Sequence, residues 1–357
     1  MANRKLTLTE ATMLLVGTQI GAGILGLPYA MRKTGVIGIL IVIGMGIITL
    51  ITALMIYDSI DDRDLTLSEL AEIHIGKWAG WLTFFSIMFY AYGAEVAYIS
   101  GVSSLIKDIL NIPVIITSVI FTFLMFYLLM FDLKISGEAE NALGILLISS
   151  LTLAIAIVLP KVSLQHLSQF SMPDFIPLIG VAMFAYASHL VVPEIHRANK
   201  EVGRKAVIYG YLIPMIFYSL FGLAFVGAYG SHVPTLALNA IRNIKPLEGI
   251  ISVAIPLLSI TTSFIGIALS QKHNIRKAFN LSSVEALILS TAPPLLIYIG
   301  GLRGFVKAIS LAGSFGAIIF AGIIPTLIYI KRHRKNLHIA YSLLALFMGV
   351  FIISLII

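Results

Sequence analysis

Long apolar runs separated by short polar links fill the chain from one end to the other. A helix needs about 20 apolar residues to cross the hydrocarbon core of a bilayer, and the runs have about this length. They fall at residues 8–31, 35–58, 77–106, 112–131, 136–159, 175–197, 205–229, 247–271, 282–300, 304–330 and 337–357. The pattern predicts an all-α polytopic membrane protein with about 11 transmembrane helices.

One polar link has a helical pattern of its own. In TLSELAEIH, residues 66–74, apolar and acidic positions alternate at helical spacing. This pattern is typical of a short helix that lies at the membrane interface, and we expect such a helix just before the third span.

The composition excludes several other classes of protein. Hydrophobic residues make up 59% of the chain and charged residues 11%, with a mean hydropathy of +0.99, whereas an ordinary soluble domain has about 25% charged residues. Cysteine is absent, which excludes disulfides and cysteine metal sites. The sequence also lacks a nucleophile paired with a base and an HExxH pattern. We therefore expect neither an enzyme nor a resident cofactor.

The distribution of positive charges predicts the orientation of the chain in the membrane. The net charge is +7, but the basic residues lie in the links between apolar runs, so nucleic acid is not an expected partner. If the N terminus is cytoplasmic, 16 lysines and arginines fall on the inner side and 8 on the outer side. Because inner loops carry the excess of positive charge, we expect a multi-pass protein of the cell membrane with a cytoplasmic N terminus and an external C terminus.

A glycine-rich stretch, GTQIGAGILGLPYAM at residues 17–31, lies in the first span. Its GxGxxG spacing matches a dinucleotide-binding loop, but such a loop needs a preceding strand and an acidic residue about 20 positions later. The next acidic residue is Asp58, at the far end of span two. Gly17 and Gly21 also have the spacing of a helix-packing motif. The density of glycines, closed by Pro28, instead favours a helix that is broken within the membrane.

The sixth span has a similar interruption. FAYASHLVVP, residues 184–193, is rich in small residues and ends in proline. Because breaks occur in spans one and six, the chain divides into two halves of five spans, which is the inverted repeat of many secondary transporters. We expect a first repeat at residues 1–160, a second at residues 161–335 and an additional helix at residues 336–357.

Two broken helices favour a zwitterionic ligand. The free amides and positive dipole at the start of a second half-helix suit a carboxylate, and the free carbonyls at the end of a first half-helix suit an ammonium or a cation. An α-amino acid is the commonest small zwitterion, so it is the expected substrate.

Both interrupted segments resemble a known family. VGTQIGAGILGLPYAMRKTG, residues 16–35, and FAYASHLVVPEI, residues 184–195, are similar to the amino acid/auxin permease family of the amino acid, polyamine and organocation superfamily. The bacterial aromatic amino acid permeases are close relatives of that family. The resemblance implies the fold named after the bacterial leucine transporter, with five plus five spans in inverted repeat and one span more. It implies that the substrate carboxylate is held by Gly21, Ala22 and Gly23, and the amine by carbonyls near Phe184, Ala185 and Ala187.

Three hydroxyl residues in span eight suggest a site for a coupling ion. Ser259, Thr262 and Ser263 fall on one helical face, and their oxygens suit a small hard cation. In the leucine-transporter fold a sodium ion lies between such hydroxyls and span one carbonyls, and the resemblance adds Gly17 and Ile20. Alternatively, the hydroxyls bond back to their own helix or to its neighbours. Span five lacks the lysine that some proton-driven relatives carry, which favours sodium over a proton as the coupling ion.

Glu95 lies near the middle of span three, where a carboxylate is costly and is functional by default. It is a candidate for proton coupling or for binding a cationic substrate, with a structural glutamate as the alternative. Tyr98 lies about one turn away and is expected to share the substrate cavity. His189 is a second proton-coupling candidate, although a lone histidine is more often structural. Candidates for an inner gate are Arg4, Lys5 and Glu194, with solvated surface charges as the alternative account.

The expected function is secondary active transport: the import of amino acids by cation-coupled symport through alternating access. By the resemblance, a bundle of spans one, two, six and seven rocks against a scaffold of spans three, four, eight and nine. The alternative is an amino acid-sensing membrane receptor, a germinant or nutrient sensor, on the same fold. The expected partners are a small-molecule amino acid and the lipid bilayer, with no obligate protein partner evident.

Overall fold

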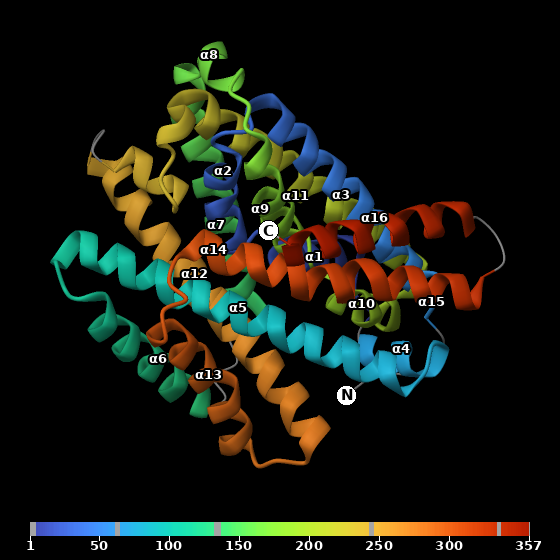
Figure 1. The fold of residues 1–357 in the computed structure, drawn as a ribbon. Coiled ribbons are helices and arrows are strands. Elements are labelled where there is room, and N and C mark those ends of the chain that lie inside the picture. The colour runs from blue at the N-terminus through green and yellow to red at the C-terminus, as the bar shows by residue number, and fades with distance from the viewer. Residues whose placement is uncertain (1–4, 61–64, 132–136, 243–245, 334–336, 357) are drawn as a thin grey trace.

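A computed structural model shows the chain folded almost entirely into helices (Figure 1). It describes residues 5–60, 65–131, 137–242, 246–333 and 337–356, and no strand occurs in these ranges. The predicted all-α class is therefore confirmed.

The spans follow the predicted order. Their elements are α1 (Leu8–Gln19), α2 (Gly23–Met31), α3 (Gly35–Tyr57), α5 (Lys77–Leu110), α6 (Val114–Met130), α7 (Gly137–Val158), α9 (Phe175–Ala185), α10 (Val192–Ala198), α11 (Lys200–Tyr229), α12 (Pro246–Phe279), α13 (Ser283–Ile299), α14 (Phe305–Leu311), η6 (Ala312–Ile323), α15 (Ile324–Arg332) and α16 (Leu337–Ile356). Eight segments of at least 18 residues are apolar enough to cross a membrane, and the bent pair α1–α2 makes a ninth. With the shorter apolar helices α6 and α13, the described chain agrees with the expected number of spans.

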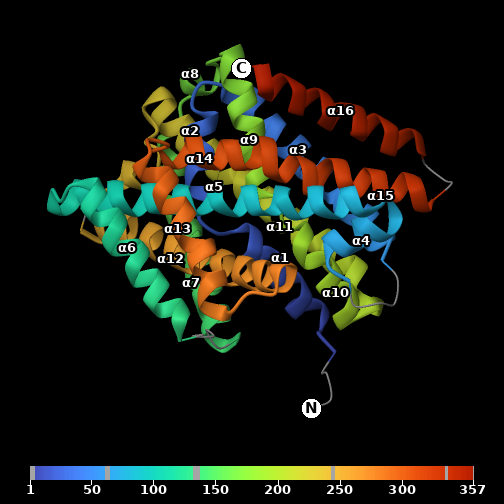
Figure 2. The ribbon, with the colours of Figure 1, turned by 60° about the horizontal axis from the view of Figure 1, so that its bottom comes forward.

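Short elements connect the spans. They are α4 (Leu67–His74), α8 (Leu164–Leu167), η1 (Leu159–Lys161), η2 (Met172–Asp174), η3 (His189–Val191), η4 (Gly230–His232) and η5 (Ala237–Ile241). At the outside of the fold α16 packs along η6 and α15, far from α6 and α13 (Figures 1 and 2). The span formed by α14, η6 and α15 includes a π-helical stretch, and η6 packs between α5, α9 and α16.

Both predicted helix breaks are present. The axis turns by 55° between α1 and α2, so the first break comprises Ile20, Gly21 and Ala22. In the sixth span α9 ends at Ala185 and the chain resumes through η3 and α10. The structure therefore confirms broken first and sixth spans.

The first break is shorter than the glycine pattern predicts. Gly23, Gly26 and Pro28 lie inside α2, where all three are buried. A Cβ at Gly26 would lie 2.9 Å from the Phe305 ring and 3.0 Å from Ile309. These glycines thus allow close helix packing, the alternative role expected for small residues in membrane helices, and this packing keeps α2 helical in spite of its proline.

The predicted interfacial helix is α4. Thr66 caps it, and the side chain of Glu69 accepts a hydrogen bond from the backbone N–H of Thr66. Glu69 Oε1 also lies 2.7 Å from Lys277 Nζ at the end of α12. Partial burial alone would raise the pKa of the Glu69 carboxyl, but the hydrogen bonds from Lys277 and Thr66 outweigh this effect and lower the pKa below its usual value. The helix is therefore tied to the rest of the protein by charge as well as by packing.

Candidate substrate and ion site

The carbonyl ends of the two broken helices meet at one side chain. Tyr218, fully buried on α11, places its hydroxyl oxygen 2.5 Å from the carbonyl oxygen of Gln19 and 3.1 Å from that of Ala185. Gln19 is the last residue of α1 and Ala185 the last residue of α9. The two breaks, far apart in the sequence, thus form one polar centre inside the membrane protein.

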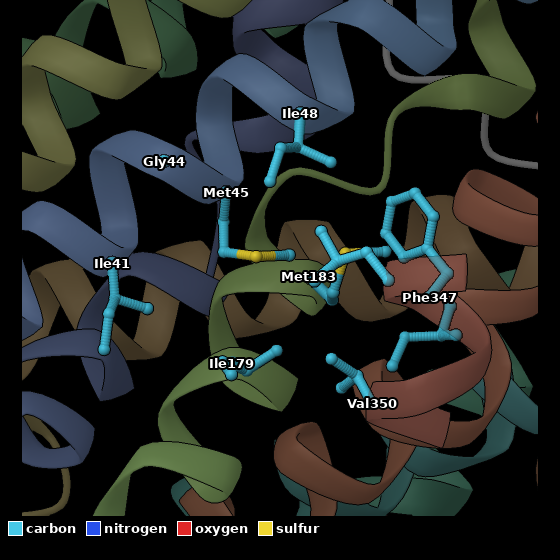
Figure 3. Close-up of a pocket in the computed structure, with 10 residues that line it drawn as sticks. Ile41, Gly44, Met45, Ile48, Ile179, Met183, Phe347 and Val350 are labelled. Carbon is cyan, nitrogen blue, oxygen red and sulfur yellow. The ribbon is translucent and has the colours of Figure 1, made fainter. Parts of the chain in front are cut away.

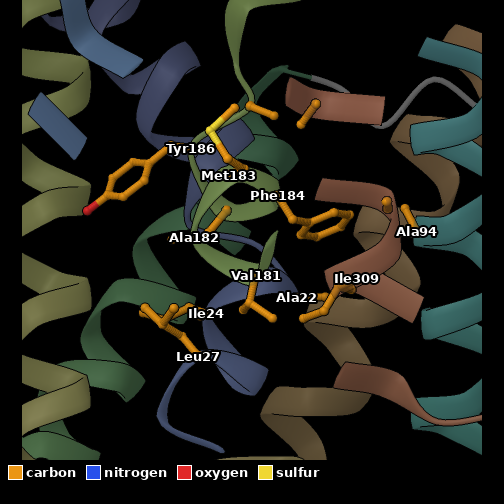
Figure 4. Packing of buried hydrophobic residues seen from close by; sticks show 14 of the residues in the cluster. Ala22, Ile24, Leu27, Ala94, Val181, Ala182, Met183, Phe184, Tyr186 and Ile309 are labelled. Atoms are coloured by element: carbon orange, nitrogen blue, oxygen red, sulfur yellow. The ribbon is translucent and has the colours of Figure 1, made fainter. Parts of the chain in front are cut away.

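The proposed carboxylate and amine residues also lie together. A Cβ at Gly23 would lie 3.2 Å from the Phe184 ring and 3.6 Å from Cα of Ala185. Phe184, Ala22 and Ala94 converge in the same part of the core, whereas Tyr186 points away from them (Figure 4). The structure therefore brings the Gly21–Gly23 segment against the Phe184–Ala187 segment, as expected of a shared site.

Aromatic side chains border this junction. Tyr90 of α5 donates a hydrogen bond of 3.3 Å to the carbonyl oxygen of Phe184, and the two ring centres are 4.9 Å apart. Tyr98, two turns further along α5, lies beside Ser263 of α12. By contrast, Tyr92 reaches outward to donate to the carbonyl of Leu289 at 2.6 Å.

Gln19, a buried polar side chain of the junction, was not among the residues predicted from the sequence. Its Nε2 donates to Ser188 Oγ and to the carbonyl of Gly210, both at 3.0 Å. Because a carbonyl only accepts, the bond to Gly210 fixes which end of the amide is nitrogen. Gln19 Oε1 is left buried and without a hydrogen-bond partner. A glutamine within an otherwise apolar span was the one sequence signal that could have revealed it.

His189 lies next to this junction and joins three spans. It is fully buried, with Nε2 2.9 Å from Thr52 Oγ1 on α3 and Nδ1 3.2 Å from the hydroxyl of Tyr211 on α11. Both ring nitrogens are therefore engaged by hydroxyl groups. This is the environment of a structural histidine, and the arrangement holds η3 between α3 and α11.

The span eight hydroxyls approach the first break through Ser263. Ser263 Oγ accepts a hydrogen bond of 3.3 Å from the amide of Ala22. Ser259 Oγ is buried and has no hydrogen-bond partner among the described residues, so its oxygen can serve as a ligand. Thr262 Oγ1 donates back to the carbonyls of Leu258 and Ser259 of its own helix. This is the alternative role expected for such hydroxyls. The lone pairs of the Thr262 oxygen nevertheless remain available to a cation.

The span one side of the candidate ion site is less complete. Ile20 is buried within the break, but Gly17 is exposed, and nothing lies within 4 Å of the place where its Cβ would be. By contrast, Ser263 of α12 approaches both Gly21 and Ala22 in the break. Among the residues with defined placement, no cluster of three or more His, Asp or Glu side chains offers an alternative metal site.

Glu95 lies on α5, one turn before Tyr98. It is fully buried, and neither oxygen of its carboxyl group has a hydrogen-bond partner in the described chain. An unpartnered carboxyl group in the membrane interior is costly, so its retention points to use rather than to packing.

The predicted inner-gate residues lie at the expected cytoplasmic end of the bundle. Lys5 Nζ is 3.4 Å from Glu201 Oε1, and both side chains are exposed. Glu194 lines the same cavity of about 710 Å³ as Lys5 and Glu201. Arg4 lies outside the described residues.

A second cavity is not suited to an amino acid. It has a volume of about 210 Å³ and lies between α3, α9, η6 and α16 (Figure 3). Its lining is apolar throughout, with side chains such as Met45, Met183 and Phe347. Such a lining offers no partner for a carboxylate or an ammonium.

The chain is similar to known amino acid transporters. The model of the tryptophan/tyrosine permease family matches residues 4–357. Tyrosine-specific transport system 1 of Haemophilus influenzae is 22% identical, over 97% of this chain and 95% of its own. Glutamine transporter 2 of Aliivibrio fischeri is 25% identical, over 92% of each chain. These relatives are transporters, which confirms the prediction that the protein is not an enzyme.

Solved structures share the fold. The crystal structure of MhsT in complex with L-phenylalanine superposes with a TM-score of 0.65 at 13% identity, covering 98% of this chain and 99% of its own. Mhp1, a nucleobase-cation-symport-1 family transporter, gives a TM-score of 0.63 at 14% identity, covering 95% and 82%. The comparisons support the expected leucine-transporter-like fold, but not the amino acid/auxin permease family to which the sequence resemblance pointed.

Proposed function

Because the chain belongs to the tryptophan/tyrosine permease family, we propose that it imports an amino acid by alternating access, coupled to a cation gradient. The observation that carries this proposal is the convergence of both helix breaks on the Tyr218 hydroxyl. Unwound backbone at membrane depth is tolerated only where it is buried or lines a cavity. The two carbonyl ends meet at Tyr218, and the amide start of α2 packs against the end of α9. The breaks therefore offer partners for both charges of an amino acid.

The binding roles follow from the polarity of the two breaks. Gly21, Ala22 and Gly23 lie where α2 begins, so the positive end of this helix suits the substrate carboxylate. The carbonyls of Phe184, Ala185 and Ala187 lie at the end of α9 and suit the amine. The aromatic rings of Tyr90 and Phe184 border the junction, which favours a substrate with a flat side chain.

Sodium is the proposed coupling ion. The hydroxyl groups of Ser259, Thr262 and Ser263 would supply oxygen ligands from α12. The carbonyls of Gly17 and Ile20 would complete the site when α1 moves against α12. A bound cation would thereby couple α1 to α12. The alternative ion is a proton, for which Glu95 is the proposed carrier and His189 a weaker candidate because both of its nitrogens are engaged.

Alternating access needs two bodies that move against each other. Lys5 pairs with Glu201, and Asp58 pairs with Arg204 at 3.2 Å; these pairs join spans one, two and seven of the proposed bundle. The Glu69–Lys277 pair joins α4 to span eight of the proposed scaffold. The proposed repeats remain residues 1–160 and 161–335, with α16 outside both, and we propose a cytoplasmic N terminus and an external C terminus.

The decisive experiment is uptake into proteoliposomes that contain the purified full chain. Radiolabelled tyrosine, tryptophan and glutamine are offered in turn, with sodium and proton gradients imposed separately. Accumulation driven by a sodium gradient is expected, and uptake that is indifferent to sodium would reject the span eight site. Tight binding without any accumulation would instead favour the sensor alternative.

A further inference from the structure

The Tyr218 hydroxyl occupies the point where the carbonyl ends of α1 and α9 meet. Gln19 and Ala185 present these carbonyls, at 2.5 and 3.1 Å from the phenolic oxygen. We propose that Tyr218 competes with the α-ammonium group of the substrate for these acceptors, and that the side-chain oxygen of Gln19 is a third acceptor for the same group. The inference rests on the proposed function and adds two positioning residues for the substrate amine.

The count of donors and acceptors supports this proposal. A phenol has one hydrogen, so Tyr218 cannot donate fully to both carbonyls. Gln19 Oε1 is a third buried acceptor and has no partner, because the amide of Gln19 uses only its nitrogen, toward Ser188 and Gly210. The Gln19 carbonyl also accepts from the backbone amide of Gly21 at 2.8 Å, but each carbonyl oxygen has two lone pairs. The single Tyr218 hydrogen therefore leaves acceptor capacity on both carbonyls and on Gln19 Oε1. A primary ammonium brings three N–H donors and would satisfy all of them.

The surroundings make such a site selective for charge. Tyr218 and Gln19 are buried, so a charged hydrogen bond there is stronger than it would be in water. Tyr186 stacks near Tyr218, with ring centres 5.0 Å apart, but its hydroxyl lies against Gly46 on α3. It therefore offers no second hydrogen to the carbonyls.

If Tyr218 competes with the substrate ammonium, removing its hydroxyl should strengthen substrate binding, whereas removing a purely structural hydrogen bond should not. In Tyr218→Phe the carbonyls of Gln19 and Ala185 lose their competing side-chain donor, while that of Gln19 keeps the Gly21 amide, so a lone pair on each carbonyl is open to the substrate. Binding of L-tyrosine should then tighten about three- to tenfold, which corresponds to the net worth of one hydrogen bond. The deaminated analogue, 3-(4-hydroxyphenyl)propionate, has no ammonium group, so its affinity should not change.

Tyr211→Phe is the matched control. Tyr211 lies two turns earlier on the same helix, is fully buried, and places its hydroxyl 3.2 Å from His189 instead of against the carbonyls of Gln19 and Ala185. Binding is measured by calorimetry on the full-length chain in lipid nanodiscs, for the wild type and both variants. Tyr218→Phe should tighten tyrosine binding and Tyr211→Phe should not.

A second pair of variants keeps the proposal testable if Tyr218→Phe is poorly folded. Gln19→Met removes the third acceptor and should weaken tyrosine binding about tenfold without affecting the deaminated analogue. Ser188→Ala removes one tether of Gln19 and leaves both its acceptor oxygen and its bond to Gly210, so it should weaken tyrosine binding less than Gln19→Met does.

Three results would overturn the inference: weaker tyrosine binding in Tyr218→Phe, equal tightening for both ligands, or a Gln19→Met effect equal for both ligands. Each of these leaves uptake by the wild type intact. A wild type that neither binds nor transports any amino acid would instead contradict the proposed function.

Discussion

Ser263 Oγ on α12 lies 3.3 Å from the backbone nitrogen of Ala22, inside the first helix break. A Cβ at the preceding Gly21 would lie only 2.8 Å from the same oxygen. This contact connects α12, part of the proposed scaffold, with the broken helix of the proposed bundle. A change at either residue should therefore act on transport more than on folding.

The first prediction concerns this contact. In Gly21→Ala, the added methyl group must push Ser263 Oγ away from the Ala22 amide, so uptake should fall at least about tenfold, as expected when binding geometry loses more than about 1.4 kcal/mol. In the double variant Gly21→Ala/Ser263→Ala the clash is absent, so uptake should exceed the value predicted by adding the two single effects. The measurement is initial uptake rate per reconstituted molecule. Strict additivity would show that the contact plays no part.

The second prediction concerns the coupling ion. Ser259 Oγ is buried and without a partner, so Ser259→Ala should raise the sodium concentration for half-maximal uptake about tenfold, the worth of one ligand hydroxyl. Ser252→Ala is the control, because Ser252 is also buried on α12 but its hydroxyl donates to the carbonyl of Gly249. Equal sodium dependence in the two variants would remove Ser259 from the ion site.

The number of spans and both breaks were predictable from the sequence because they depend on local features. Apolar runs of bilayer length specify the spans, and glycine at position 21 marks the first break. The extent of that break was not predictable. Pro28 lies inside α2 because packing against α9, α11 and α14 maintains the helix, and such tertiary contacts leave no trace in one segment of sequence.

The polar junction was only partly predictable, for a similar reason. Gly21, Ala22, Gly23 and Phe184 follow from the break pattern and the family resemblance. Tyr218 lies 199 residues from Gln19, to which it donates, and a single tyrosine in an amphipathic span has no distinguishing signal. Only the packing of spans that are distant in the sequence shows that the Tyr218 hydroxyl faces both breaks.

The third prediction tests the substrate side of the junction. In Gly23→Val, the side chain would collide with the Phe184 ring, which lies 3.2 Å from the Cβ position. Uptake should be lost without loss of expression. Gly44→Val on α3 is the control, since nothing lies within 4 Å of its Cβ position, and it should retain uptake. Normal uptake by Gly23→Val would place the substrate elsewhere.

The fourth prediction concerns pH and the interfacial helix. Hydrogen bonds from Lys277 and Thr66 hold the pKa of Glu69 below its usual value, so this carboxylate stabilises the folded state above the ordinary carboxyl pKa of about 4.3. That contribution is lost as the pH falls through the folded pKa. Glu69→Gln should therefore cost about 0.2–1 kcal/mol at pH 7, the range for exposed ion pairs, and the cost should vanish in acid. Thermal unfolding of both proteins across this pH range measures it, and a difference that is independent of pH would contradict the assignment.

The fifth prediction follows from the buried carboxyl group of Glu95. Because neither of its oxygens has a partner, Glu95→Met removes an uncompensated polar group and should stabilise the protein by about 1–3 kcal/mol. If the carboxyl group serves the transport cycle, uptake should fall at least about tenfold in the same variant. Asp108→Asn, at the exposed end of α5, should change neither property. Thermal unfolding and uptake are measured on the same preparations. A destabilised Glu95→Met would show that the carboxyl group is needed for folding, and a stabilised variant with full uptake would show that transport does not use it.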